Sequence, residues 1–223
     1  MLLLNKNIRA CVFDAFGTLF NLDIPSEKID QLTEGKGKEL LAIWRRKQLE
    51  YTWLRGLMDN HVPFDQVTRH ALTFAMESVG TESMELYDIL MPIYKKAIAF
   101  PEIKPMLEHL RAAGIKTAIL SNGSPDMLHA GTKNAGIDHL IDHIFSVESV
   151  GVFKPSPKVY QLALDGLSLK KEELLFFSSN QWDVAGATHF GLETVWVNKY
   201  NQVPEQLERQ AKYVIRDLGM IEC

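Results

Sequence analysis

The sequence predicts an α/β fold in which a doubly wound parallel sheet carries an inserted helical domain. From about residue 100 onwards, short apolar runs rich in β-branched or aromatic residues alternate with helical patterns, which is typical of βαβ units. Residues 25–98 break this alternation, because their apolar residues recur at helical spacing. We therefore predict a core domain of residues 1–24 and 99–223, and a helical domain of residues 25–98 that covers the carboxyl ends of the strands.

Apolar runs define the strands of the predicted sheet. The first run ends immediately before Asp14, and later runs predict strands over residues 117–120, 144–147, 174–178 and 194–197. A proline near the first turn of a helix is favoured by its fixed φ, and Pro125 and Pro155 occupy such places after the second and third strands. Helical spacing in the inserted segment is carried by Leu40, Ile43, Trp44, Tyr51, Leu54 and Met58.

Length and composition narrow the functional classes. The chain has 223 residues, of which 46% are hydrophobic and 23% charged, as in an ordinary soluble globular protein. A formal net charge of −4 without a long basic stripe gives nucleic acid little to bind. Cys11 and Cys223 are too few for a disulfide framework, and the N-terminal apolar run is too short for a signal peptide or a membrane span. We expect a cytoplasmic protein without nucleic-acid or membrane partners.

Asp14 is the first candidate for chemistry. It ends an apolar strand and opens a glycine turn in the run DAFGTL at residues 14–19. A carboxylate at the carboxyl end of a buried parallel strand lies where open α/β sheets bind ligands, and it can act as a nucleophile. The alternative is a carboxylate that caps the loop by accepting bonds from the amides of Gly17 and Thr18. Phe16, two residues after Asp14, can neither give nor take a proton.

Polar residues follow the other predicted strands as well. Ser121 and Asn122 precede a helix N-terminus and form either an anion site or an N-cap with a turn. Lys154 follows the third strand, where it is either a cation beside Asp14 or a surface lysine. Ser178, Asn180 and Asp183 follow the fourth strand, so their side chains are expected near the same edge of the sheet.

Residues 14–19 resemble the first motif of the haloacid dehalogenase superfamily, Asp-x-x-Gly-Thr-Leu, and Lys154 stands in the place of its third motif. Most members are phosphatases, which have a general acid at the position of Phe16 and an acidic cluster that holds Mg²⁺ after the fourth strand. Loss of a general acid costs about 10²–10⁴ in rate. A halide leaves without a proton, and the run Ser-x-Asn-x-x-Asp at residues 178–183 is similar to that of the type II L-2-haloacid dehalogenase branch.

A stretch of the helical segment, residues 42–55, resembles the part of L-2-haloacid dehalogenases that carries the halide-abstracting arginine, and this role falls on Arg45. Helical geometry agrees, because Leu41 and Leu49 lie one turn away on either side. Arg46 is expected to form a surface ion pair with Glu50, although some relatives have Gln at that position and a changed pocket edge is the alternative.

The resemblance implies a role for each further site residue. Lys154 and Asp183 pair, Ser178 and Asn180 hold the hydrolytic water, and Ser121 and Asn122 lie beside the substrate carboxylate. The catalytic set implied is Asp14, Thr18, Arg45, Lys154, Tyr160, Ser178, Asn180 and Asp183. The substrate-binding set is Ala15, Phe16, Arg45, Leu49, Phe64, Ser121, Asn122 and Trp182. For Tyr160 and the aromatic residues, a place in the core is the alternative.

The function implied is hydrolytic dehalogenation of (S)-2-haloalkanoic acids to (R)-2-hydroxyalkanoic acids, with inversion at C2 and an ester on Asp14. The resemblance implies a homodimer that needs no metal or other cofactor and takes a small haloacid as substrate. His139 and His143 have the i,i+4 spacing of a helical metal pair, but a solvated helix face is preferred for them. The rival functions are a Mg²⁺-dependent phosphatase of the same superfamily and a non-catalytic binding module.

Overall fold

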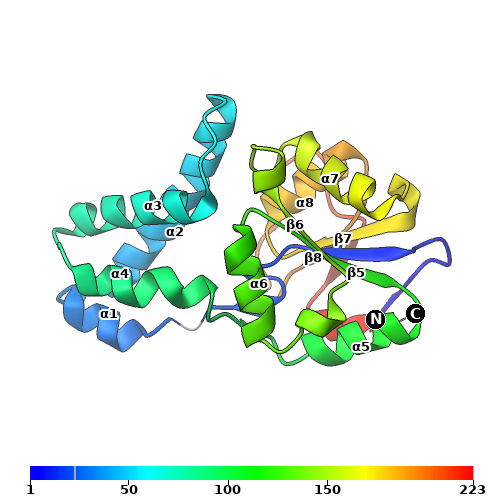
Figure 1. Ribbon diagram of the computed structural model, residues 1–223, viewed down its shortest axis with the longest axis horizontal. Coiled ribbons are helices and arrows are strands. Elements are labelled where there is room, and N and C mark those ends of the chain that lie inside the picture. The colour runs from blue at the N-terminus through cyan, green and yellow to red at the C-terminus, as the bar shows by residue number, and fades with distance from the viewer. Residues whose placement is uncertain (23, 223) are drawn as a thin grey trace.

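The structure is a computed structural model that describes residues 1–22 and 24–222 (Figure 1). Its centre is a six-stranded parallel sheet in the order β6-β5-β2-β7-β8-β9. The strands are β2 (Ala10–Phe13), β5 (Lys116–Ser121), β6 (His143–Ser146), β7 (Leu174–Ser178), β8 (Glu193–Val197) and β9 (Tyr213–Ile215). The α/β fold with a parallel sheet that the sequence predicted is therefore confirmed.

Helices cover both faces of this sheet. The helices after the inserted segment are α5 (Ile103–Ala112), α6 (Pro125–Asn134), α7 (Pro157–Leu167) and α8 (Gln181–Phe190). Helices α7 and α8 lie on one side of the sheet and α5 on the other (Figure 1). Alternate residues of β2 separate the two cores: Val12 packs with the α7 side, and Cys11 and Phe13 with the α5 side. The strand β2 is buried on both faces, as a central parallel strand has to be.

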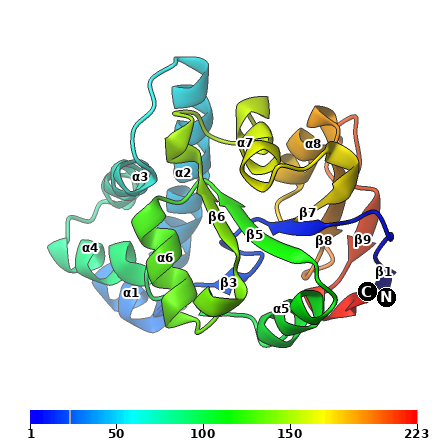
Figure 2. The same cartoon turned by 45° about the vertical axis from the view of Figure 1, so that its right-hand side comes forward.

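A helical segment lies beside the sheet domain. It consists of α1 (Ser26–Leu32), α2 (Gly37–Leu57), α3 (Phe64–Val79), α4 (Met84–Leu90) and the 3₁₀ turn η1 (Met91–Tyr94). Both connections to the sheet domain pass through a short antiparallel pair, β3 (Phe20–Asn21) with β4 (Ile98–Ala99). Figures 1 and 2 show this segment at one end of the molecule, with the last turns of the long helix α2 projecting from it.

The two ends of the described chain are also paired. Strand β1 (Leu2–Leu3) runs parallel to β10 (Ile221–Glu222), so both termini lie side by side at the edge of the sheet domain (Figure 2). Cys223 lies outside the described residues, whereas Cys11 is buried in β2. No helix in the described part of the chain is both long enough and apolar enough to cross a membrane.

Several local predictions need correction. Residues 139 and 143 do not share a helix, because His139 belongs to the 3₁₀ turn η2 (Asp138–Leu140) and His143 begins β6. The helix α7 begins at Pro157, so Pro157 rather than Pro155 takes the first helical position, with Ser156 before it. Pro125 does begin α6 as predicted, behind the N-cap residue Ser124.

The helix α2 also differs in detail from its prediction. Lys47, not Arg46, forms the ion pair with Glu50, at 2.8 Å between Nζ and Oε1. Leu54 and Met58 fit the helical spacing but are 43% and 63% exposed, because the end of α2 extends beyond α3. The apolar spacing therefore located the helix correctly and misplaced part of its buried face.

Candidate active site

Asp14 lies at the carboxyl end of β2, between the ends of β5 and β7. The chain continues from β2 to β5 on one side and from β7 to β8 on the other, so a crevice forms at the carboxyl ends of these strands. The backbone N–H of Asp14 continues the ladder to β7 by donating to the carbonyl of Phe177 at 2.8 Å. The residue is 8% exposed, which leaves its carboxylate shielded from bulk water but within reach of a ligand.

Side-chain donors from three segments fix the Asp14 carboxylate. Its Oδ2 accepts from Thr18 Oγ1 at 3.1 Å, from Asn180 Nδ2 at 3.0 Å and, weakly, from Ser178 Oγ at 3.5 Å. Its Oδ1 accepts from Lys154 Nζ at 3.2 Å. Hydrogen bonds to an ionised carboxylate are among the stronger ones in proteins, and together they hold the group in one orientation.

Lys154 is 1% exposed and bridges two carboxylates. Its Nζ lies 3.2 Å from Asp14 Oδ1 and 2.8 Å from Asp183 Oδ2. Burial disfavours the charged ammonium, but Asp14 and Asp183 outweigh this effect, so the pKa of Lys154 is raised above its ordinary value. The side chain therefore remains a cation next to Asp14, as the sequence predicted.

Burial raises the pKa of Asp183 to about 6, against the opposing attraction of Lys154 and with a further increase from the charge of Asp14. Tyr160 donates from its hydroxyl, which lies 2.9 Å from Asp183 Oδ1, and this bond favours the ionised carboxylate. Burial, followed by the charge of Asp183, raises the pKa of Tyr160 well above its usual value, so the phenol keeps its proton. Tyr160 acts on Asp183 and makes no hydrogen bond to Asp14 among the described contacts.

The other strand-end residues mostly serve the backbone. Ser121 Oγ accepts from the amide of Gly123 at 3.1 Å, and Asn122 Oδ1 accepts from the amide of Lys154 at 2.9 Å. The turn-forming alternative for Ser121 is thus present, and Asn122 holds the chain at Lys154. Ala15 is fully buried, and its carbonyl accepts from three amides of the glycine turn, those of Thr18, Leu19 and Phe20.

A cleft of about 610 Å³ opens between the helical segment and the strand ends. Its walls include Phe16, Arg45, Leu49, Tyr94, Asn180 and Trp182. Asn180 belongs to this wall and also contacts Asp14, so the cleft leads to the carboxylate. The volume is within the range of small-molecule sites.

Arg45 connects the helical segment with the strand ends. Its Nη1 donates to Gln48 Oε1 at 2.9 Å and its Nη2 to Asn180 Oδ1 at 3.4 Å. Among the described residues Arg45 forms no ion pair, so its positive charge is not neutralised by a carboxylate. Beside it, the ring of Trp53 on α2 meets that of Trp182 on α8 edge to face, with centroids 5.6 Å apart.

Four of the predicted substrate-binding residues are not part of the cleft wall: Ala15, Phe64, Ser121 and Asn122. Phe64 belongs instead to the packing of the helical segment. It is 3% exposed and packs against the rings of Tyr94 and Phe153. Tyr94, which the sequence prediction omitted, lines the cleft and meets the ring of Phe16 edge to face at 4.8 Å. The sequence prediction omitted Gln48 too. A signal was present, because Gln48 is a polar residue that continues the i,i+4 series of Leu40 and Trp44 on a buried helix face.

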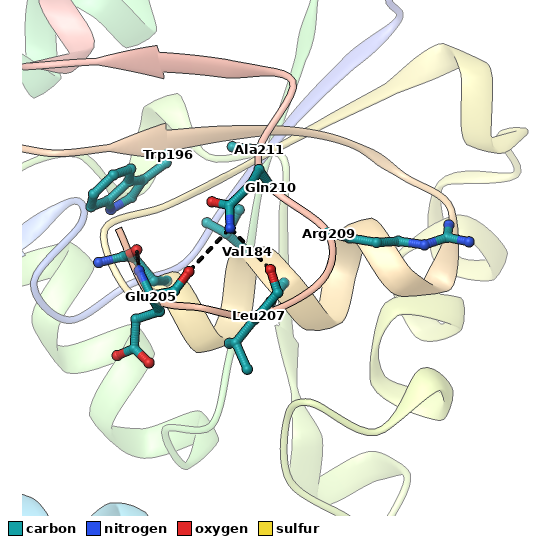
Figure 3. Close-up of a pocket in the computed structure, with 9 residues that line it drawn as sticks. Val184, Trp196, Glu205, Leu207, Arg209, Gln210 and Ala211 are labelled. Carbon is teal, nitrogen blue, oxygen red and sulfur yellow. Dashed lines mark hydrogen bonds between the residues drawn. The ribbon is translucent and has the colours of Figure 1, made fainter. Parts of the chain in front are cut away.

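The C-terminal loop, residues 198–212, forms the outer wall of the cleft. The side-chain amide of Gln181, at the start of α8, anchors this loop with two hydrogen bonds. Its Nε2 donates to the carbonyl of Val203 at 3.0 Å, and its Oε1 accepts from the backbone amide of Glu205 at 2.6 Å. Gln210 donates back to the carbonyls of Glu205 and Leu207, as Figure 3 shows. The loop is therefore closed over α8 and Trp196, and it holds one side of the cleft in place.

Within the described residues, no cluster of three or more His, Cys, Asp or Glu side chains is arranged to hold a metal ion. Two acids, Asp14 and Asp183, do meet at the strand ends, but the ammonium of Lys154 lies between them. The site is thus built from the Asp14 carboxylate, which the buried Lys154 bridges to Asp183, and from Arg45 on the cleft wall, with Asn180 in contact with both Asp14 and Arg45.

The chain is similar to known proteins over most of its length. Residues 8–191 match the family model described as haloacid dehalogenase-like hydrolase. The chain is 39% identical to an (S)-2-haloacid dehalogenase of Pseudomonas sp. (strain YL), over 96% of this chain and 93% of the relative. It is 41% identical to (S)-2-haloacid dehalogenase 4A of Burkholderia cepacia, over 96% and 93% of the two chains.

Among solved structures, an L-2-haloacid dehalogenase of Xanthobacter autotrophicus with chloropropionic acid covalently bound superposes with a TM-score of 0.87. It is 35% identical to this chain, and the match covers 95% of this chain and 96% of that one. The family match over most of the chain, together with the identities to the (S)-2-haloacid dehalogenases, leads to one conclusion. The chain belongs to the haloacid dehalogenase-like hydrolases.

Proposed function

We propose that this protein hydrolyses (S)-2-haloalkanoic acids to (R)-2-hydroxyalkanoic acids, with inversion at C2 and an ester intermediate on Asp14. The observation that carries the proposal is that Asn180 contacts both the fixed carboxylate of Asp14 and the guanidinium of Arg45. This guanidinium has no carboxylate partner among the described residues. The carboxylate suits attack on carbon, and the guanidinium suits a departing anion. The relatives described as (S)-2-haloacid dehalogenases support the same reaction.

In the first step an oxygen of Asp14 forms a bond to C2 as the carbon–halogen bond breaks, and the halide leaves with the bonding electrons. Attack from the side opposite the halide inverts the carbon. Arg45 receives the halide in a cleft with aromatic walls, where charge interactions are stronger than in water. A carboxylate held in a fixed position can provide an effective concentration on the order of 10⁵–10⁸ M for this displacement.

In the second step water attacks the carbonyl carbon of the Asp14 ester, and the bond to the alcohol oxygen breaks. One water proton ends on the hydroxy acid, the other is released, and Asp14 returns to a carboxylate. Ser178 and Asn180 are placed to hold this water, since both contact Asp14 Oδ2. Lys154 stabilises the developing oxyanion, and Asp183 with Tyr160 holds Lys154 in position.

We further infer that residues 25–98 work as a cap, that the protein is a cytoplasmic homodimer, and that it needs no cofactor. Arg45 on the helical segment reaches Asn180 on the sheet domain, which supports a cap that completes the site.

An exposed apolar end of α2 supports association of two copies: Leu57 is 85% and Met58 63% exposed.

The first experiment is halide release from each enantiomer of 2-chloropropionate in the presence of EDTA. We expect release from the (S) form alone, with (R)-lactate as product. A single turnover in H₂¹⁸O should place the label in Asp14 rather than in the first lactate. Label in the first product would contradict the ester, and activity only on phosphate esters with Mg²⁺ would favour the phosphatase instead.

A further inference from the structure

Gln48 is a fully buried amide on the face of α2 that packs against α3. It is 0% exposed and lies one turn beyond Trp44, which is 4% exposed. Burying a primary amide is unfavourable unless its donors and acceptor are satisfied. Its hydrogen-bond partners are Thr68, Tyr94 and the guanidinium of Arg45, and the last two of these residues line the cleft.

The hydrogen-bond partners decide which way this amide faces. Thr68 Oγ1 donates its one hydrogen to the carbonyl of Phe64 at 2.7 Å, so towards Gln48 it can only accept. Gln48 Nε2 fills that role at 2.8 Å, and the carbonyl oxygen Oε1 consequently points the other way, to Arg45 Nη1 at 2.9 Å. The hydroxyl of Tyr94 closes the arrangement, 2.9 Å from Nε2 and 3.2 Å from Oε1.

Arg45 is therefore held between two amide oxygens, one from each part of the molecule. Gln48 Oε1 holds Nη1, and Asn180 Oδ1 accepts from Nη2 while its Nδ2 donates to Asp14 Oδ2. Neutral acceptors orient a guanidinium without neutralising its charge, whereas a carboxylate would pair with it. These two bonds use two of the five N–H groups, so donors remain for an anion.

We propose that Gln48, oriented by Thr68 and Tyr94, is a positioning residue that holds the Arg45 guanidinium ready for the departing halide. The inference rests on the function proposed above and adds to it a part of the machinery that does not touch the substrate. Its consequence is that the hydroxyl of Thr68, on a different helix, contributes to the stabilisation of the halide through Gln48 alone.

Thr68→Val tests this chain of contacts without altering Arg45 or Gln48. The single-turnover rate of halide release should fall about tenfold, within the effect of losing a hydrogen bond that orients a charged group. The loss should be larger for 2-chloropropionate than for 2-bromopropionate, because chloride is the poorer leaving group. Thr73→Val is the matched control: Thr73 lies on the same helix and bonds the same way to a carbonyl four residues back, but it faces Tyr87. It should leave both rates unchanged.

Gln48→Glu provides a second test with nearly the same side-chain shape. The new carboxylate would pair with Arg45 and neutralise it, so we expect inhibition by free bromide to require about tenfold more bromide. Circular dichroism of each variant tests whether it is folded. Because Gln48→Glu preserves size, it carries the test if Thr68→Val does not fold.

The outcomes separate the two proposals. If the unaltered protein releases no halide from either enantiomer, the proposed function fails and this inference fails with it. If the unaltered protein is active while Thr68→Val and Gln48→Glu keep its rates and bromide inhibition, only the role of Gln48 is overturned. Equal losses with chloro and bromo substrates would also overturn it, because the defect would then lie outside halide stabilisation.

Discussion

At the scale of single residues, the site is organised around one buried cation. Lys154 is 1% exposed and lies between Asp14 and Asp183, so each of these carboxylates is balanced by the same ammonium. Replacing Lys154 by a neutral residue would leave two acids facing each other, and breaking a buried ion pair in this way typically costs about 3–5 kcal/mol. Lys154 therefore contributes to folding as well as to the electrostatics of the site.

The pKa of Asp183 gives a pH prediction. Burial raises it to about 6, and Lys154 is held in place by the ionised form. Activity should therefore fall as the pH decreases through about 6. The Tyr160 hydroxyl favours the ionised carboxylate, so Tyr160→Phe should move this fall in kcat/KM to higher pH. Tyr87→Phe, which removes a hydroxyl that bonds to Thr73 in the helical segment, should leave the profile unchanged. An unshifted profile for Tyr160→Phe would contradict the role given to Tyr160.

At the scale of elements, the contact between α7 and α8 positions Tyr160 of α7 against Asp183 of α8. A methyl group at Gly186 on α8 would come within 2.5 Å of Pro155 Cβ and 2.6 Å of the Tyr160 hydroxyl. Gly186→Ala should therefore lower the unfolding free energy by about 1–3 kcal/mol through overpacking. Gly56→Ala is the matched control within a helix, because its methyl group would meet Val152 at an ordinary 3.7 Å. Gly56→Ala should raise the unfolding free energy by up to about 1 kcal/mol. Thermal unfolding measures both, and equal melting temperatures would contradict the packing argument.

The strands and helices also differ in how far the sequence could predict them. Parallel strands bring their carboxyl ends together, so the strand pattern could place Asp14 and the run after β7 at one edge of the sheet. For Lys154 the pattern left a surface position open, and the family resemblance favoured a place beside Asp14. Short edge pairs such as β1 with β10 and the strand β9 were missed, because two or three residues carry no readable periodicity. The contacts of Tyr94 and Phe64 depend on how the helical segment packs against the sheet domain. That packing is tertiary, so the sequence pattern placed Phe64 at the substrate and left Tyr94 out.

At the scale of the whole molecule, the proposed homodimer can be tested on the apolar end of α2. The last turns of α2 and the loop after it project from the molecule (Figure 1). Sedimentation should give twice the chain mass of 25.3 kDa. Leu57→Asp should produce monomers, because Leu57 is 85% exposed and a buried, unpaired carboxylate is costly in an interface. Val214→Asp, at a 59% exposed position on β9, should leave the dimer intact. A monomeric unaltered protein would contradict the proposal.

The contact between Trp53 and Trp182 supplies the molecule with an optical reporter of its own. The Trp53 indole belongs to the helical segment and the Trp182 indole, which lines the cleft, to the sheet domain, and the two rings meet edge to face. Movement of the helical segment away from the sheet domain on this side parts the rings and changes the surroundings of both, so tryptophan emission follows that movement in real time. Comparing the emission trace with halide release would show whether chemistry or the separation of the two parts limits turnover.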